Sequence, residues 1–261
     1  MAEKIIKKVL DIDLDFFLSA KEILKPMSDV RRLEEGVYIP WSESDTRNFL
    51  EKQCELSVNH PIQGASFVQH DEVFYYLRKV MEENEHGFTF DIDHVDAHAD
   101  LGMGDDSYQY LSESMLWKPL KERPYQEKHA GRTRLTGANY LAFCIACRWV
   151  KSLNYINKPE WSDDLPQFLF KGFDVTQNLM LKQFTHEQMQ KITNFNYGDW
   201  LGTAKKEVPV AVEPEVPFRV IDWRNFKVDG AYDYVFLTQS PGYTPRSSDK
   251  LLRIIQSYIK V

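Results

Sequence analysis

The segment Phe90-Asp91-Ile92-Asp93-His94-Val95-Asp96-Ala97-His98-Ala99-Asp100-Leu101 changes from largely apolar to acidic at its middle. Its first half belongs to an apolar run over residues 87–95, which predicts a buried strand. Asp96, His98 and Asp100 then recur at every second position, so in an extended chain their side chains point to one side. Two carboxylates and one imidazole at a strand end favour a divalent metal ion. A solvent-facing polar strand is the alternative, but the apolar flanks indicate burial, and buried carboxylates need a metal or other partners.

A second acidic strand opens the chain, over residues 9–17. Asp11, Asp13 and Asp15 alternate there with apolar residues, so one face is apolar and the other carries three carboxylates. These charges repel one another unless cations neutralise them. Two other interpretations stay open, a solvated edge strand and the nucleophile strand of a phosphatase, although no downstream lysine and acidic pair accompanies the latter.

A third element is His70, at the expected start of a helix over Asp71–Glu83. Alone, it would more often be a helix-start contact than a ligand, but the two carboxylate strands reverse that preference. The candidates then amount to two imidazoles and four or five carboxylates, with no thiolate among them. Such an oxygen-rich set suits Mn²⁺ better than structural zinc, and it is sufficient for two ions roughly 3.5–4 Å apart.

The rest of the chain alternates between strand-like and helix-like patterns. Residues 25–65 are rich in loop-forming residues, and residues 101–128 form a long polar and aromatic connection with one short helix. This alternation predicts an α/β fold, a mostly parallel sheet with helices on both faces. The expected strands are 9–17, 87–95, 153–156, 168–173, 218–222 and 233–238, and the expected helices are 19–24, 71–83, 137–151, 186–194 and 247–259.

Length and charge limit the class of protein. With 261 residues, 43% of them hydrophobic and 27% charged, the chain suits one globular α/β domain over residues 1–261. The 32 basic and 39 acidic residues give a net charge of −7, without a basic run, which argues against nucleic-acid binding and favours a basic partner. Apolar stretches fall short of the roughly 20 residues of a membrane helix, and the charged opening does not resemble a signal peptide.

The three cysteines point to a reducing compartment. Cys54, Cys144 and Cys147 cannot form a closed set of disulfides, so we expect free thiols and a cytoplasmic protein. Cys144 and Cys147 match a redox spacing, but they fall inside an expected helix rather than at its start. A structural role in the core is therefore favoured over redox or metal chemistry.

The acidic segments carry a family resemblance. Asp96-Ala97-His98-Ala99-Asp100 resembles the metal signature of the arginase and agmatinase (ureohydrolase) superfamily, whose α/β fold is shared with histone deacetylases. His70 stands upstream like the single upstream histidine ligand of that family, and Asp13-Leu14-Asp15 resembles its Asp-x-Asp strand. The resemblance implies an arginase/deacetylase-like fold and two Mn²⁺ ions. The implied ligands are Asp13, Asp15, His70, Asp96, His98 and Asp100, with Asp11 as the second choice in the first strand.

The order of these segments points to one branch of the family. In ordinary arginases the Asp-x-Asp strand follows the metal signature, whereas here it opens the chain, as in peptide arginases. Those enzymes convert arginine side chains within ribosomally made peptides to ornithine and release urea. The resemblance thus implies an arginine-containing precursor peptide as partner. It also implies Asp100 and His98 as catalytic residues, with Asp100 relaying a proton to the leaving amine.

Two family positions lack a clear match. The next histidine after the signature is His129, beyond a long loop, and the region around residues 136–139 looks more like that part of the family. Where the family has a glutamate that contacts the guanidinium, residues 234–241 offer only Gln239 and Ser240.

Three rival functions remain. They are a deacetylase-like amidohydrolase with one zinc ion, a hydrolase of free arginine or agmatine, and a metal-stabilised binding module without activity. Aromatic and acidic residues in two loops suit an extended basic peptide, although packing of loops onto the domain explains them equally well. These residues are Asp105, Asp106, Tyr108, Tyr110, Trp117 and the stretch 38–41.

Overall fold

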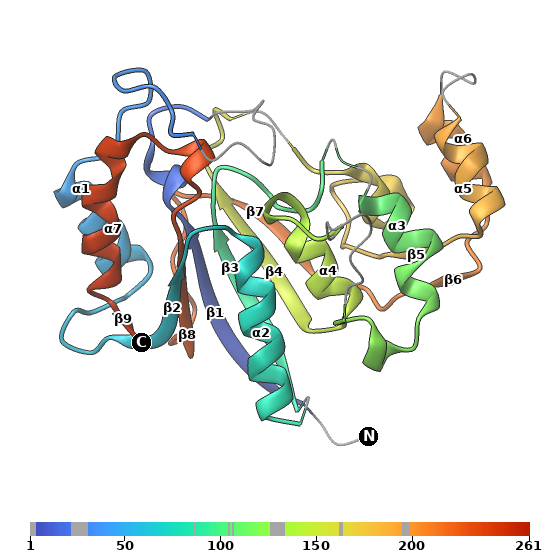
Figure 1. Ribbon diagram of the computed structural model, residues 1–261, viewed down its shortest axis with the longest axis horizontal. Helices are drawn as coiled ribbons and strands as arrows, with labels where there is room; N and C mark the ends of the chain where they lie inside the picture. The colour runs from blue at the N-terminus through green and yellow to red at the C-terminus, as the bar shows by residue number, and fades with distance from the viewer. Residues whose placement is uncertain are drawn as a thin grey trace.

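A parallel sheet forms the centre of the molecule (Figure 1). The structure, a computed structural model, describes residues 4–21, 31–85, 87–103, 105, 107–125, 134–161, 164–194 and 199–261. Within these residues seven strands pair in parallel, which confirms the predicted α/β fold. In spatial order the strands are β7 (Phe218–Asp222), β4 (Val150–Asn157), β3 (Phe88–Val95), β1 (Ile5–Asp13), β8 (Tyr234–Thr238), β2 (Ile62–Phe67) and β9 (Ile259–Lys260).

Helices cover both faces of the sheet, as predicted. Val9 of the central strand β1 packs into a core with α2 and α4 on one face. The next residue, Leu10, packs into a second core with α7 and the turn that continues α1. Because side chains alternate along a strand, Asp11 and Asp13 extend the face of Val9. These elements are α1 (Glu43–Asn48), its π-helical continuation η2 (Phe49–Gln53), α2 (Asp71–Glu83), α4 (Tyr140–Ala146) and α7 (Asp249–Gln256).

Smaller elements gather to the right of the sheet in Figure 1. They include a short antiparallel pair and three helices, of which α5 confirms the helix expected over residues 186–194. None of the helices in the described residues combines the length and the apolar character needed to cross a bilayer. The elements are α3 (Ser107–Glu113), α5 (His186–Thr193), α6 (Trp200–Lys206), β5 (Lys182–Gln183) and β6 (Ala211–Val212).

Strong apolar patterns gave correct bounds. The helix over Asp71–Glu83 and the strand over Phe218–Asp222 occur as predicted, and β3 and β8 begin one residue inside their predicted ranges. The expected helix over residues 19–24 falls partly outside the described residues, and residues 19–21 are not helical. The last helix is shorter than predicted, because a 3-10 turn precedes α7 and β9 follows it.

The strand predicted over residues 168–173 is wrong. Two 3-10 turns occupy this segment, and Gly172 has a φ of 61°, which interrupts any extended backbone. Phe168 and Phe170 are buried in the core, so their apolar character reflects aromatic packing rather than a sheet. The buried ammonium of Lys182 donates to the carbonyls of both residues and so replaces strand partners.

Two further differences concern where elements end. The helix predicted over residues 137–151 stops at Ala146, because Arg148 has a φ of 54° and the chain enters β4 at Val150. Strand β2 lies in a region predicted to be loop-rich. Its sequence is weakly apolar, and a Cβ at Gly64 would collide with the carbonyl of Val235 on β8, so glycine permits the close pairing there.

Candidate metal site

The acidic segments follow two neighbouring strands of the sheet. The parallel register pairs Asp11 of β1 with His94 of β3 and Ile12 with Val95. Asp11 and His94 therefore point from adjacent strands to the same face, the one covered by α2 and α4. Because the carboxyl ends of parallel strands meet at one edge, the residues after β1 and after β3 share a small volume.

Short turns, rather than an extended chain, orient the side chains that follow β1 and β3. The strands end at Asp13 and Val95, so the predicted period-two extension through Asp100 is wrong. Asp13 Oδ1 accepts the N–H of Asp15 at 3.1 Å, and Asp96 Oδ1 accepts the N–H of His98 at 2.7 Å. Aspartate commonly makes such turns with the backbone two residues on. They bring His98 Nδ1 to 3.0 Å from Asp15 Oδ2.

His70 completes the cluster from a third segment. It lies directly before α2, and its Nδ1 is 3.1 Å from Asp13 Oδ2, 3.2 Å from Asp96 Oδ2 and 2.8 Å from Asp100 Oδ2. Asp100 reaches this position with a φ of 49°, a left-handed conformation that is uncommon outside glycine. One imidazole nitrogen thus faces three carboxylates that the sequence analysis selected.

Four groups of possible ligand atoms occur among the described residues, and three of them share Asp96. Two of those three consist only of predicted ligands. The first consists of Asp13, His70 and Asp96, with Asp100 beside the same imidazole nitrogen. The second consists of Asp15, Asp96 and His98. The fold therefore brings all six predicted ligands together, in two adjacent sets.

Unpartnered atoms inside the first set fit a cation. His70 Nδ1, Asp96 Oδ2 and Asp100 Oδ2 are buried and have no hydrogen-bond partner among the described residues. Buried polar atoms nearly always have partners, and burying a carboxylate without one is costly. One divalent cation would be a partner for all three atoms. The cluster can thus hold a metal ion, as its chemistry suggested.

Asp11 lies behind the ligand atoms and orients one of them. Its Oδ1 is 3.2 Å from His70 Nε2, and its Oδ2 accepts the hydroxyl of Tyr140, whose ring stacks on that of His70. With the Nε2 proton held by Asp11, the Nδ1 lone pair of His70 is free to bind a metal ion. The sequence pattern favours Asp11 only as the second choice of ligand, and it does not point to Tyr140.

His94, which the sequence analysis also missed, supplies a positive charge. Its Nδ1 is 3.0 Å from Asp11 Oδ2 and its Nε2 is 3.1 Å from the carbonyl of His98. A carboxylate and a carbonyl both accept, so the doubly protonated ring satisfies both contacts. Although burial acts to lower the pKa of His94, its hydrogen bond to Asp11 and the charge of Asp96 raise it to about 9.

The carboxylates differ in proton affinity. Burial, followed by the charge of Asp96, raises the pKa of Asp100 to about 7, and burial with the charges of Asp13 and Asp96 raises that of Asp15. Burial also acts to raise the pKa of Asp96, but His70 and His94 outweigh it and hold that pKa well below its usual range. These raised pKa values reflect the repulsion among carboxylates that share a small volume. A bound divalent ion would reduce this repulsion and favour their deprotonated forms.

The loop after β8 closes another side of the cluster. Ser240 donates its hydroxyl to Asp13 Oδ2, and its φ of 45° is strained for a residue other than glycine. Gln239, the other polar candidate of this region, instead donates to Asp249 at 3.1 Å. Of the two residues, only Ser240 therefore contacts the cluster.

The open side of the site lies at His98. Its side chain is 21% exposed, whereas that of Asp96 is 1% exposed. The ring of Tyr243 lies 4.9 Å from the His98 ring. Burial raises the pKa of the Tyr243 hydroxyl above its usual value, and the charge of His98 opposes this shift. The cluster is thus most accessible beside His98 and Tyr243.

The aromatic residues of the long connection contact other parts of the domain, although Trp117 is 47% exposed. Tyr108 contacts Phe168, Tyr110 stacks on Phe143, and Trp117 donates its indole N–H to the carbonyl of Phe184. Asp105 accepts from Asn139 at 2.9 Å. These contacts support the loop-packing interpretation rather than a peptide surface. Asp106 and His129 lie outside the described residues.

The cysteines lie apart from the cluster. Cys144 lies within α4 and Cys147 directly follows it, and both are buried free thiols, as is Cys54. Burial raises the pKa of all three, which favours the unreactive neutral form. A structural role is therefore supported.

Asp11→Asn tests the division between ligand and supporting residue. We expect it to weaken divalent-metal binding about 10- to 100-fold without abolishing it, because the amide no longer fixes the His70 proton. Asp15→Asn, a matched change at a ligand position, should reduce metal binding further. Isothermal titration with Mn²⁺ measures both. If Asp11→Asn abolished binding and Asp15→Asn bound normally, Asp11 would be the ligand.

Comparison of the chain with protein-family models, with curated proteins and with solved structures found no match.

Proposed function

We propose that this protein is a Mn²⁺-dependent hydrolase that converts arginine side chains of a peptide to ornithine and urea. The observation that carries the proposal is the pair of ligand sets that share Asp96 at the open edge of the sheet. Both consist of carboxylate oxygens and imidazole nitrogens, the donors that suit Mn²⁺. The resemblance of the acidic segments to peptide arginases supplies the reaction.

The proposed reaction is hydrolysis of the guanidinium group of an arginine side chain. The bond from the side-chain nitrogen to that carbon breaks, water provides the urea oxygen, and ornithine leaves with an amine. When bound, two neighbouring divalent cations supply an activated water molecule and stabilise developing negative charge. In this proposal, the Asp100 carboxylate would bind an ion through Oδ2, and its other oxygen, Oδ1, carries the proton of water to the leaving amine.

Other residues bind and orient the substrate. The cluster's five carboxylates favour a cationic group, and the protein's net charge of −7 favours approach of a basic peptide. In this proposal, His98 would bind an ion in the second ligand set. Its exposed edge, together with Tyr243, lines the entrance to the cluster. Ser240 keeps Asp13 in place by hydrogen bonding.

A deacetylase-like amidohydrolase is the second candidate. The hydroxyl-bearing ring of Tyr243 beside His98 favours it, because an O–H donor near the ions can stabilise a carbonyl oxygen. The second ligand set of Asp15 and His98 favours the two-ion arginase reaction.

The test uses Mn²⁺-loaded protein and two peptides that differ in one residue, arginine or acetyl-lysine. We expect urea from the arginine peptide, with loss of one CH₂N₂ unit in high-resolution mass spectrometry. Release of acetate from the acetyl-lysine peptide would instead support the second candidate. Absence of both products at full metal occupancy would contradict the proposal.

Metal loading should also stabilise the fold. At about 100 times the dissociation constant a ligand of the native state adds about 2.7 kcal/mol, which shifts Tm by roughly 5–10 °C in a chain of this size. We expect this rise when Mn²⁺ is added to chelator-treated protein, measured by calorimetry. Asp96→Asn should abolish most of the rise, and Asp91→Asn, on the preceding strand β3 and outside the cluster, should keep it. An unchanged Tm in millimolar Mn²⁺ would contradict a resident metal.

A further inference from the structure

A pocket of about 380 Å³ lies on the face of the sheet opposite the metal cluster. Its aromatic wall consists of Trp41, Phe49 and Trp223, all of which pack with the core of α7. The cluster, in contrast, faces α2 and α4. The 3-10 turn η1 (Leu14–Phe17), which carries Asp15, lies between the two. The pocket is thus a separate site, and its role does not rest on the proposed function.

A buried ammonium group lines this pocket. Lys158, 5% exposed, follows β4, and among the described residues its Nζ donates only to the carbonyl of Leu18. Two aromatic rings lie near it, with ring centroids 4.4 Å away for Trp161 and 4.9 Å away for Trp41. Within the described chain, no carboxylate lies within ion-pair distance of it.

The energies of these contacts leave the ammonium undercompensated. A cation over an aromatic ring gains less free energy than the removal of an ammonium from water costs. In agreement, burial lowers the pKa of Lys158 to about 8. An anion in the pocket would compensate the positive charge of Lys158.

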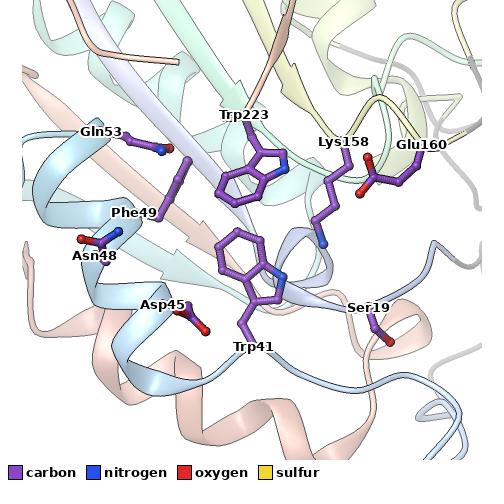
Figure 2. Close-up of a pocket in the computed structure, with 9 residues that line it drawn as sticks. All are labelled: Ser19, Trp41, Asp45, Asn48, Phe49, Gln53, Lys158, Glu160 and Trp223. Atoms are coloured by element: carbon purple, nitrogen blue, oxygen red, sulfur yellow. The ribbon is translucent and has the colours of Figure 1, made fainter. Parts of the chain in front are cut away.

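The neighbouring donors point to a carboxylate. Figure 2 shows the indole nitrogens of Trp41 and Trp223 on the sides of their rings that face Lys158. Neither indole N–H has a hydrogen-bond partner among the residues that the structure describes. The two rings lie 4.8 Å apart at 56°, so they also offer flat apolar surface. Three N–H donors beside aromatic faces match a carboxylate attached to a planar group.

The two acidic residues that line the pocket do not make it a binding site for a cation. Asp45 already accepts the hydroxyl of Ser42 at 2.6 Å, at the start of α1. Glu160 is exposed, so its carboxylate can turn to water when an anion enters. The buried Oε1 of Gln53 has no donor among the described residues, and it would accept an N–H or O–H on the ligand.

We propose that this pocket binds a planar carboxylate, with the carboxylate against Lys158 and the ring against Trp41 and Trp223. The ligand is a small arenecarboxylate or an acidic molecule of similar shape. Its carboxylate receives hydrogen bonds from the ammonium and the two indoles.

The test compares benzoate, benzamide and benzamidine, which have one shape and charges of −1, 0 and +1. Each is added to the full chain in chelator, so that divalent ions play no part. The ¹H–¹⁵N signals of the six indole groups report binding, with Trp41→Phe and Trp223→Phe used for assignment. We expect benzoate to shift the Trp41 and Trp223 signals, benzamide to bind at least tenfold more weakly, and benzamidine to have no effect.

Lys158→Met should remove the benzoate shifts, whereas Lys171→Met, at an exposed ion pair with Glu215, should keep them. If Lys158→Met does not fold, the comparison of benzoate, benzamide and benzamidine on the unmodified protein still tests the proposal. Benzamidine shifts as large as those of benzoate, benzoate shifts that survive Lys158→Met, or no shifts in millimolar benzoate would each overturn the proposal.

Discussion

Asp96→Ala is expected to abolish urea release from an arginine-containing peptide, while the protein remains folded. Asp96 contributes to both ligand sets, so its loss disrupts both metal positions at once. Metal ions supply several kcal/mol of transition-state stabilisation, and the rate should fall about a thousandfold or more. Steady-state urea release at saturating Mn²⁺ measures the effect, and circular dichroism reports folding.

Two further variants make this result specific. His98→Ala removes a ligand of one set and should also abolish activity. Asp91→Ala, on the preceding strand β3, loses a contact with Ser152 and should keep activity within a fewfold of the unmodified protein. Full activity of Asp96→Ala, or of chelated protein, would contradict a metal-dependent hydrolase.

Arginine inside a peptide is expected to react with a kcat/KM orders of magnitude above that of free arginine. Free arginine carries an α-carboxylate and an α-amino group, which a binding site must pair with charges or hydrogen bonds. Among the described residues, no lysine or arginine forms an ion pair with the cluster, so no such side chain stands beside it to pair with the α-carboxylate. A peptide lacks both charges at an internal arginine.

Nα-acetyl-arginine amide is the matched control, because it blocks both charges without adding peptide length. It should react faster than free arginine, and a longer peptide faster still. The three substrates are compared at one Mn²⁺ concentration. Similar kcat/KM values for free arginine and the peptide would exclude the peptide preference and leave a plain arginase.

The ligand atoms were predictable because their spacing is local. Two short alternating runs stand out in the sequence, and both occur where an apolar strand ends. They contain Asp13 and Asp15 in the first, and Asp96, His98 and Asp100 in the second. How they converge was not predictable. The Asp13 and Asp96 turns that aim their neighbours depend on backbone hydrogen bonds after the strands end.

The supporting residues depend on tertiary contacts. Asp11 meets His94 only because β1 and β3 pair in one register, and Tyr140 reaches them from a helix 129 positions along the chain from Asp11. His94 looks like a strand residue until its two acceptors are known. Likewise, the buried ammonium of Lys158 has no sequence signature, since only Trp161 is close to it in the sequence and the rings of Phe16 and Trp41 come from distant segments.

The central position of β1 has a consequence for how this site is encoded. Every strand of the sheet delivers its following residues to the same edge, whatever its place in the chain. The segment with Asp13 and Asp15 needs only to lie between β3 and β8, and it serves equally well as the first or a later strand. Rearranging the segments along the gene would change every linear spacing and leave the three-dimensional site intact. Recognition of such proteins therefore depends on matching sheet neighbours rather than the order of motifs.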